Sequence, residues 1–199
     1  MGLTRFETLS HYFYIKDNNY MKQRGDVGYD PLFKIRPLLD HVRTNCTAVI
    51  PEARQCVDEQ MEKFKGRSHL KQYLPKKPTK WGYKIIARCG SSGIIYDLHI
   101  QGDKFTPPQP AIGFCGDIVL HLCVSLPPEQ PFLVYCDHFY TSLALVRRLQ
   151  ERNIFFVGTI MSNRLKKCPL KSEKELQWGQ SDLVVDANSG IMVLKWLDR

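Results

Sequence analysis

The stretch PFLVYCDHFYTSLALVRRLQERNIFFVG, which runs from Pro131 to Gly158, decides the fold of this chain. It begins with Phe132 to Cys136, a continuous apolar run that is typical of a strand buried on both faces. Tyr140 to Arg152 follows, where apolar residues recur at the spacing of a helix. The apolar stripe of this helix would consist of Leu143, Val146 and Leu149. Phe155 to Ile160 is a second apolar run, so the stretch predicts two buried strands joined by a helix.

Upstream of this stretch, three further segments are expected to form strands. Cys56 to Met61 is short and mixed, which favours a strand whose solvent side carries the carboxylates. Tyr83 to Cys89 and Ile94 to Ile100 are β-rich, and the intervening Gly90-Ser91-Ser92-Gly93 indicates a hairpin. The segment from Ile112 to Leu126 is apolar at helical spacing and ends at a Pro-Pro pair, which predicts a helix.

The expected elements from Cys56 onward follow the order β, β, β, α, β, α, β. Three antiparallel strands followed by alternating helices and strands resemble the ribonuclease-H-like order. We therefore expect an α/β (α+β) chain with a mixed sheet, in which residues 51–163 form a ribonuclease-H-like core of catalytic type.

The segments on either side of this core have a different character. Residues 1–50 should be helical, with Pro37 kinking or restarting a helix that begins near Pro31. After Asn163 the sequence becomes polar and Lys-rich. Leu183 to Val185 and Ile191 to Trp196 then predict a hairpin that turns at Asn188-Ser189-Gly190.

The overall charge of the chain indicates a polyanionic partner. Lys and Arg number 28 against 20 Asp and Glu, so the net charge is +8, which favours nucleic acid first and an anionic membrane second. No window approaches ~18 uninterrupted apolar residues, so no transmembrane helix is expected. The seven cysteines contain no C-x-x-C pair, which disfavours a zinc cage or a disulfide framework and favours the cytosol or the nucleus.

Two aspartates are candidate metal ligands. Asp137 directly follows the apolar run that starts at Phe132, and ligands of α/β sheets bind at the carboxyl ends of strands. Asp58 lies in the first expected strand, so the two carboxylates would converge if their strands are neighbours. Close carboxylates repel one another, and a divalent cation such as Mg²⁺ removes that penalty. Each residue also has an ordinary explanation, because Asp137 precedes a helix that it could cap and exposed acids such as Asp58 are common.

A basic stretch separates the two aspartates. Lys63 to Arg88 contains nine Lys or Arg and no Asp or Glu, with His69, Tyr73 and Trp81 interleaved. Each phosphate that such a side chain neutralises releases counterions and adds sequence-independent affinity for nucleic acid. A solvated charged face is the alternative interpretation.

Several blocks of this sequence closely resemble the piggyBac transposase family. The first catalytic block is matched by Val57-Asp58-Glu59-Gln60, Phe64-Lys65-Gly66-Arg67 and the stretch from Tyr73 to Gly82. The second is matched by Cys136-Asp137-His138-Phe139-Tyr140-Thr141-Ser142, followed by Val157-Gly158-Thr159 and Asn163-Arg164. Arg5-Phe6, Asp17-Asn18 and the stretch from Lys34 to Asp40 resemble the helical region upstream of the family's core. The resemblance covers nearly the whole chain.

The family consists of cut-and-paste DNA transposases of the DDE/DDD type, with a ribonuclease-H-like core and three metal-binding aspartates. The resemblance implies that Asp58 and Asp137 are the first and second catalytic ligands of a two-ion Mg²⁺ site. Asp182, Asp186 and Asp198 lie in no recognisable third block, so no third catalytic acid is identified. The resemblance also implies a partial dimerisation and DNA-binding region over residues 1–50 and the start of an insertion domain over 164–199. On this basis the chain would be truncated at both ends, without the family's zinc module.

The implied partner is double-stranded DNA resembling a transposon end, with a homodimer as a further option and no membrane. The location expected from this is the nucleus, with the cytosol as the alternative. The side chains expected to contact DNA are Lys65, Arg67, Lys71, Lys76, Lys77, Lys80, Lys84 and Arg164.

Three functions are compatible with these motifs. The chain could be a metal-dependent transposase, a domesticated non-catalytic module that binds DNA or a protein, or a truncated product without function. Loss of one metal ligand removes most of the metal affinity. We therefore expect the ancestral strand cleavage and transfer to be lost, and the 199 residues alone to carry out no strand transfer.

Overall fold

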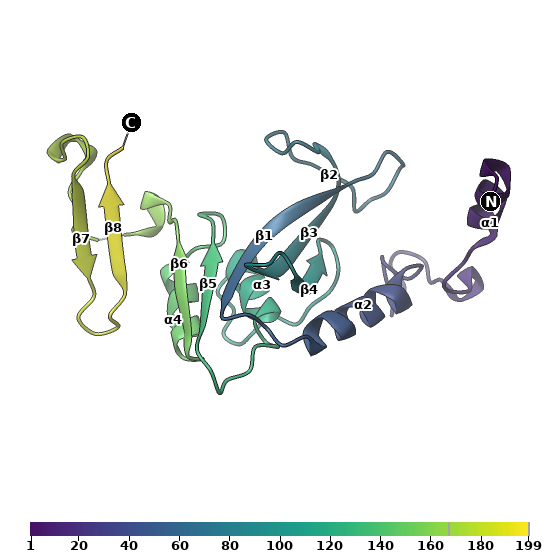
Figure 1. Cartoon of the computed structure of the whole chain (residues 1–199), viewed down its shortest axis with the longest axis horizontal. Coiled ribbons are helices and arrows are strands. Elements are labelled where there is room, and N and C mark those ends of the chain that lie inside the picture. The colour runs from purple at the N-terminus through teal and green to yellow at the C-terminus, as the bar shows by residue number, and fades with distance from the viewer. Residues whose placement is uncertain (167, 199) are drawn as a thin grey trace. The chain divides into compact units, whose positions relative to one another are not determined.

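The computed structural model describes residues 1–166 and 168–198, and they form two compact units (Figure 1). Of the described residues, unit 1 comprises 1–52 and 56–106, and unit 2 comprises 53–55, 107–166 and 168–198. No helix within the described part of the chain is long and apolar enough to cross a membrane. The division that the sequence predicts, at residues 50 and 163, stays a prediction.

Unit 1 combines helices with an antiparallel sheet. Its elements are α1 (Leu3–Tyr12), a 3-10 turn (Asn18–Tyr20), α2 (Arg36–Ala48), β1 (Arg54–Lys63), β2 (Gln72–Tyr73), β3 (Trp81–Gly90) and β4 (Ile95–Ile100). The strand order is β2-β3-β1, and β4 pairs antiparallel with the second half of β3. Leu39 of α2 packs with Ile100 of β4 in a core that also contains Leu32 and Leu70. The burial of these apolar side chains holds α2 against the sheet.

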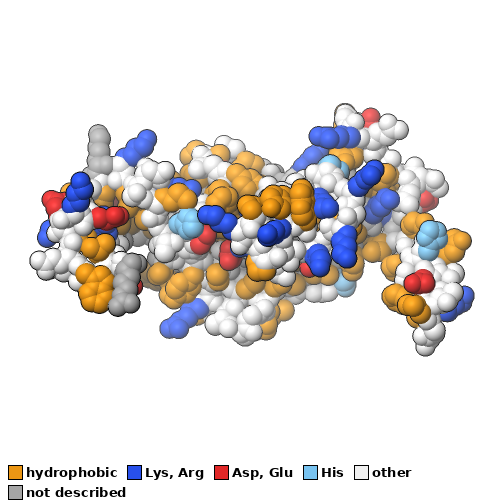
Figure 2. Space-filling view, turned by 90° about the horizontal axis from the view of Figure 1, so that it is seen from above, with side chains coloured by type: hydrophobic (Ala, Val, Ile, Leu, Met, Phe, Trp, Pro, Cys, Tyr) orange, Lys and Arg blue, Asp and Glu red, His pale blue; other side chains and the backbone are white. Residues whose placement is uncertain are grey.

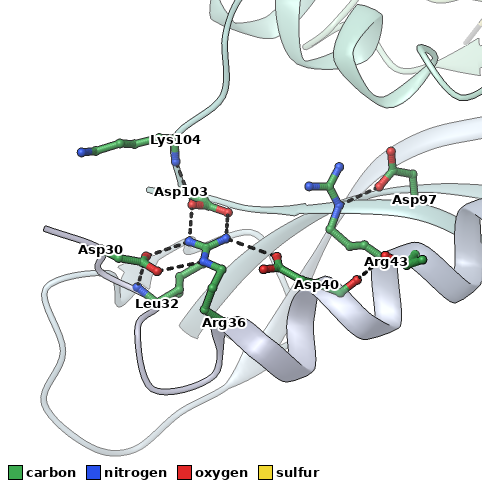
Figure 3. A network of polar contacts seen from close by, with 9 residues as sticks. Asp30, Leu32, Arg36, Asp40, Arg43, Asp97, Asp103 and Lys104 are labelled. Atoms are coloured by element: carbon green, nitrogen blue, oxygen red, sulfur yellow. Dashed lines mark hydrogen bonds and ion pairs between the residues drawn. The ribbon is translucent and has the colours of Figure 1, made fainter. Parts of the chain in front are cut away.

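The start of α2 is fixed by a partly buried ion-pair network (Figure 3). The Arg36 guanidinium donates to both carboxylate oxygens of Asp30, at 2.7 and 2.9 Å, and to both of Asp103, at 2.6 and 2.8 Å. Two turns further along α2, the Arg43 side chain donates to Asp97 at 3.0 Å. Because Asp103 follows β4, this network connects the helix to the end of the sheet hairpin.

Unit 2 is built on a parallel strand pair. Its elements are α3 (Phe114–Leu122), β5 (Phe132–Cys136), α4 (Leu143–Gln150), β6 (Ile154–Gly158), 3-10 turns at Ser162–Arg164 and Glu173–Glu175, β7 (Ser181–Val185) and β8 (Met192–Trp196). β5 and β6 are parallel, with Phe132 opposite Ile154 and Cys136 opposite Gly158. Helix α4 packs on β6 and on α3. The first residues of β1 also belong to this unit, and the Leu133 N–H donates to the Ala53 carbonyl at 2.8 Å.

Most of the predicted elements are confirmed. The chain is α/β with a mixed sheet, and β1, β3, β4, α3, β5, α4 and β6 follow the predicted order. β5 has the predicted bounds, and β7 and β8 form the predicted antiparallel hairpin. The 3-10 turns and the two-residue strand β2 were not predicted, because their stability depends on neighbours distant in sequence.

Two predictions about local structure are wrong. The helix expected to start near Pro31 begins only at Arg36, which agrees with the alternative that Pro37 restarts the helix. Pro37 occupies the first turn, where the missing N–H of proline leaves no hydrogen bond broken. The second strand of the opening stretch is not buried on both faces, since Phe155 is 60% exposed. Alternate side chains of a strand point to opposite faces. Ile154 is buried on one face of β6, whereas Phe155 lies on the opposite, open face.

Candidate functional site

Asp137 lies at the carboxyl end of β5, as predicted from the apolar run before it. Its Oδ1 accepts a hydrogen bond from the Phe139 N–H at 2.9 Å. Its carbonyl accepts from the Thr141 N–H at 3.2 Å and from the Thr141 hydroxyl at 2.7 Å. The side chain remains 41% exposed. Asp137 therefore shapes the loop after β5 with one carboxylate oxygen while its carboxylate stays accessible to a ligand.

The cap of α4 is Ser142, not Asp137. The Ser142 hydroxyl accepts from the Leu145 N–H at 3.2 Å, at the first turn of the helix. Asp137 precedes this cap by five residues, so the ordinary explanation of Asp137 as a helix cap does not hold. His138 lies beside it, with Nδ1 3.8 Å from Asp137 Oδ2, which is too long for a hydrogen bond.

Arg164 holds the loop that contains Asp137. Its Nη1 donates to the carbonyl oxygens of His138 at 2.9 Å, Phe139 at 3.1 Å and Thr141 at 2.8 Å. Sequence reasoning assigned Arg164 to DNA and missed this role, because nothing in the local sequence indicates a contact 23 to 26 residues away. The structure thus gives Arg164 a positioning role next to the candidate carboxylate.

Gly158 permits the close approach of chain segments at the same place. A Cβ on Gly158 would lie 2.6 Å from the Cys136 carbonyl oxygen and 2.7 Å from the Thr141 hydroxyl oxygen. Both distances are shorter than side-chain carbons tolerate. Any larger residue would push the end of β6 away from the Asp137 loop, so glycine is required here for the packing of this loop.

Asp58 lies in β1, as predicted, and its side chain is exposed while the preceding Val57 is fully buried. The Asp58 Oδ1 accepts from the Glu59 N–H at 2.7 Å. Burial raises the pKa of the Cys89 thiol in β3, and the negative charge of Asp58 adds to that increase. The carboxylate of Asp58 is therefore solvent-accessible, and it is close enough to β3 for its charge to act on Cys89.

The donor chemistry of both aspartates suits a hard cation, since Mg²⁺ takes oxygen ligands. Within residues 1–166 and 168–198, no three or more His, Cys, Asp or Glu side chains group closely enough to hold a metal ion. Asp182 instead accepts from the Lys171 N–H at 2.7 Å, and Asp186 accepts from the Ser189 hydroxyl in the β7–β8 turn. Asp182 is thus bonded to the segment before β7 and Asp186 to the hairpin turn, and the metal roles of Asp58 and Asp137 stay predictions.

The basic stretch surrounds β2, where Lys and Arg side chains gather at the surface (Figure 2). Those of Lys65, Arg67, Lys76 and Lys80 are exposed. Lys71 is partly buried, with Nζ 5.1 Å from the centroid of the Trp81 ring. Lys77 is paired with Glu59, with Nζ 2.9 Å from Oε1.

Lys84 differs from the rest of the predicted DNA-contacting set. It is 8% exposed within β3, and a side chain buried there has little surface to offer a phosphate. The cause is the alternation of the strand, which turns Lys84 to the same face as the buried Gly82 and Ile86. Lys84 is therefore not part of the basic surface that is open to solvent.

Comparisons with known proteins agree with the resemblance noted in the sequence. A family model described as Transposase IS4 matches residues 1–199. PiggyBac transposable element-derived protein 2 of Homo sapiens is 30% identical over 98% of this chain and 33% of its own length. PiggyBac transposable element-derived protein 3 of Homo sapiens is 27% identical over 100% of this chain and 34% of its own. The chain thus spans about a third of the length of these curated relatives.

A solved structure supports the fold independently. The cryo-EM structure of a piggyBac transposase synaptic complex with hairpin DNA superposes with a TM-score of 0.84 at 24% identity. The similarity covers 100% of this chain and 41% of that one. With the family match over every residue, the chain belongs to the Transposase IS4 family, and within it to the piggyBac-type transposases and the proteins derived from them.

Proposed function

We propose that this chain is the part of a piggyBac-type, transposase-derived protein that binds double-stranded DNA through the basic surface around β2. The observation that carries the proposal is the exposure of Lys65, Arg67, Lys76 and Lys80 in a segment without a single acidic residue. A similar chain has been solved in a complex with hairpin DNA, which supports the same partner. Such a partner would place the protein in the nucleus.

The physical basis of this binding is the polyelectrolyte character of DNA. Each lysine or arginine that neutralises a phosphate releases condensed counterions, so affinity falls steeply as salt rises. Lys77 contributes less to this surface because its charge is already paired with Glu59. The sequence-independent part of the affinity therefore comes mainly from the exposed, unneutralised side chains.

We further propose that Asp58 and Asp137 are carboxylate ligands for Mg²⁺. Asp58 is exposed and Asp137 is partly exposed, and each has one oxygen fixed by a backbone N–H of its own loop or strand. When bound, the cation would supply the Lewis acidity needed for phosphodiester chemistry. The contribution of this chain is to hold Asp137 in a defined loop, through Thr141 and Arg164.

Strand transfer by the isolated 199 residues is not expected. No third acidic ligand has been identified in the sequence, and the described residues contain no cluster of three candidate ligands. A protein-interaction module is a second candidate function. It is favoured by the exposed apolar face of β7 and β8, which presents Leu183, Val185, Met192, Leu194 and Trp196.

The DNA-binding proposal can be tested by a charge-matched comparison. In the test variant, Lys65, Arg67, Lys76 and Lys80 are replaced by Ala. In the control variant, the exposed Arg5, Arg24, Lys34 and Lys174 are replaced by Ala, which removes the same charge elsewhere. Binding to a blunt DNA duplex is measured by fluorescence anisotropy over a range of salt concentrations.

The test variant should bind more weakly, and the slope of log affinity against log salt should become shallower by about 3 to 4. The control variant should lose far less of its DNA affinity. Equal losses in both variants would mean that only net charge matters, and the proposal of a DNA-binding surface around β2 would then be wrong.

A further inference from the structure

The basic surface contains a groove that the binding of duplex phosphates does not explain. It measures about 480 Å³ and lies between the end of β1, the β2–β3 loop and the start of β3. It is lined by the lysines Lys63, Lys65, Lys71 and Lys80 and by the aromatic residues Phe64 and Trp81. None of its described lining residues carries a negative charge. The groove therefore combines positive charge with flat apolar surface.

Trp81 is the main aromatic surface of this groove. The residue pairs with Tyr73 across β2 and β3, and the two rings lie 4.7 Å apart at an angle of 39°. Trp81 is nevertheless 53% exposed. One part of the indole is thus supported by Tyr73, and another part remains open to solvent, which is the arrangement of a stacking platform.

The backbone beneath this platform is closely packed. A Cβ on Gly82 would lie 2.0 Å from the Glu62 carbonyl oxygen, so only glycine fits where β1 and β3 approach each other. The Phe64 N–H also lies 3.5 Å from the Trp81 carbonyl oxygen. A site carried on paired strands holds its side chains more accurately than one on a free loop. Trp81 is therefore presented from a rigid part of unit 1.

The Lys71 ammonium group lies over the Trp81 ring within the groove. Its Nζ lies 5.1 Å from the Trp81 ring centroid and donates to the Gly66 carbonyl at 3.1 Å. An ammonium group binds an anion more strongly than it binds a ring or a neutral carbonyl. A phosphate that enters the groove would draw Lys71 away from the ring and uncover more of the indole.

We propose that this groove binds an unpaired nucleotide of DNA, with its base stacked on Trp81 and its phosphates neutralised by the surrounding lysines. The bases of an intact duplex are stacked on one another, so a duplex alone cannot place a base on this ring. An acidic peptide would satisfy the lysines but offers no flat partner for the indole. The inference rests on the proposed DNA binding and specifies the form of DNA that this part of the surface takes.

The test uses the full 199-residue chain and two probes. These are a single-stranded oligo-dT of about 15 nucleotides, which is within the range of known single-strand sites, and a blunt duplex. The variants are Trp81→Ala, Trp81→Phe and, as a matched control, Trp178→Ala, which removes another exposed tryptophan.

Trp81→Ala should weaken oligo-dT binding by about tenfold and leave duplex binding within about twofold, since stacking contributes only where a base is free. Trp81→Phe, which keeps an aromatic ring, should recover most of the affinity. Trp178→Ala should change neither. In a chain with Trp178 and Trp196 replaced by Phe, oligo-dT should also quench the fluorescence of Trp81.

The inference would be overturned if Trp81→Ala weakened the binding of both probes equally, or if it changed the binding of neither probe. Competition by a polyglutamate peptide as effective as that by oligo-dT would overturn it too, because the groove would then recognise charge alone. If duplex binding still depends on the lysines around β2 in these experiments, only the groove assignment fails. If that dependence is also absent, the proposed function fails with it.

Discussion

The Nη1 of Arg164 donates to the carbonyl oxygen of Thr141 at 2.8 Å, and thereby closes the loop that begins at Asp137. The Thr141 hydroxyl in turn donates to the Asp137 carbonyl at 2.7 Å. One guanidinium thus stabilises a loop whose side-chain orientation would decide any chemistry at Asp137. Because all of these contacts are made to main-chain carbonyls, the loop conformation is held independently of the side chains at positions 138 and 139.

Replacement of Arg164 by Met should loosen this loop. Three carbonyls lose a charged donor, and the expected loss is about 1–3 kcal/mol in the free energy of unfolding. Hydrogen exchange of the Phe139 and Thr141 amides should accelerate, since both amides are bonded inside the loop. Arg147→Met is the control, because the Arg147 pair with Asp186 is exposed and 3.8 Å long. Unchanged exchange at Phe139 in Arg164→Met would refute the positioning role.

Asp137→Asn should weaken the binding of Mn²⁺, used as a spectroscopic substitute for Mg²⁺. An asparagine side-chain oxygen can still accept from the Phe139 N–H, so the loop is retained while the charge is lost. We expect a loss of at least about tenfold in affinity for Asp137→Asn and likewise for Asp58→Asn. Electron paramagnetic resonance of free Mn²⁺ provides the measurement. Asp182→Asn, in the β7–β8 hairpin, should behave as the unsubstituted chain; an equal loss there would point to nonspecific binding.

The 199-residue chain should not join or cleave DNA strands in the presence of Mg²⁺. The reason is that a two-ion mechanism needs protein ligands for both cations, and only two candidate acids, Asp58 and Asp137, have been identified. The assay is the nicking of a supercoiled plasmid, which reports a single cleavage. Nicking that depends on Mg²⁺ and disappears in Asp137→Asn would show the prediction to be wrong.

The Arg36 network should make the stability of unit 1 depend on pH. The hydrogen bond that the Asp30 carboxylate accepts from Arg36 lowers the pKa of Asp30 below its ordinary value of 3.8. Burial raises the pKa of Asp103, but hydrogen bonding and charge attraction to Arg36 outweigh it, so the net change is also a decrease. Groups with a depressed pKa in the folded state stabilise it above their ordinary pKa. That stabilisation is lost as the pH falls through the folded-state value.

Arg36→Met should therefore lower stability at neutral pH by about 2–3 kcal/mol, because the 9%-exposed Asp103 carboxylate loses its charged partner. The difference between the variant and the unsubstituted chain should shrink at about pH 3. Urea unfolding followed by circular dichroism at both pH values measures this. If Arg36→Met lowered the free energy of unfolding equally at both pH values, the loss would not come from the ionised Asp30 and Asp103 carboxylates. Arg24→Met serves as a surface control.

We propose that the exposed apolar face of the β7–β8 hairpin mediates self-association, so a charge on this face should reduce self-association without unfolding the hairpin. Leu194 lies opposite Leu183 on this face, and both are at least half exposed. Leu194→Glu should therefore shift light scattering toward smaller species while the melting temperature stays within a few degrees, as for other surface substitutions. Val193→Glu, on the more covered face of the same strand, should destabilise instead. Unchanged scattering in Leu194→Glu would mean that this face has no role in association.

Local sequence was sufficient for the elements whose own residues decide their structure. Phe132 to Cys136 is apolar throughout and is followed by a polar residue, so β5 could be placed with its observed bounds. The β7–β8 turn is placed equally well, because Gly190 adopts a positive φ of 69° that favours glycine. Asp58 and Asp137 were located on the correct strand and strand end for the same reason.

Features that depend on distant parts of the chain were not predictable. The exposure of Phe155 depends on the position of α4, which covers one face of β6 only. In the sequence, Lys84 cannot be distinguished from the other lysines of the basic stretch. Its burial follows from the alternation of side chains along β3. The pairing of Trp81 with Tyr73, and thus the aromatic floor of the groove, depends on a strand of two residues.

The amino-acid sequence by itself determined the order of helices and strands, the family and the identity of the two candidate ligands, because these depend on local periodicity and on uninterrupted motifs. Only the tertiary structure decided which charged side chains remain at the surface and which form contacts within the protein. Arg164 is the clearest case: it lies in a family motif, but its Nη1 is bound to carbonyls more than twenty residues away. Hydrogen bonds between residues so far apart in the chain form only when packing brings those residues together, and no local sequence pattern encodes them.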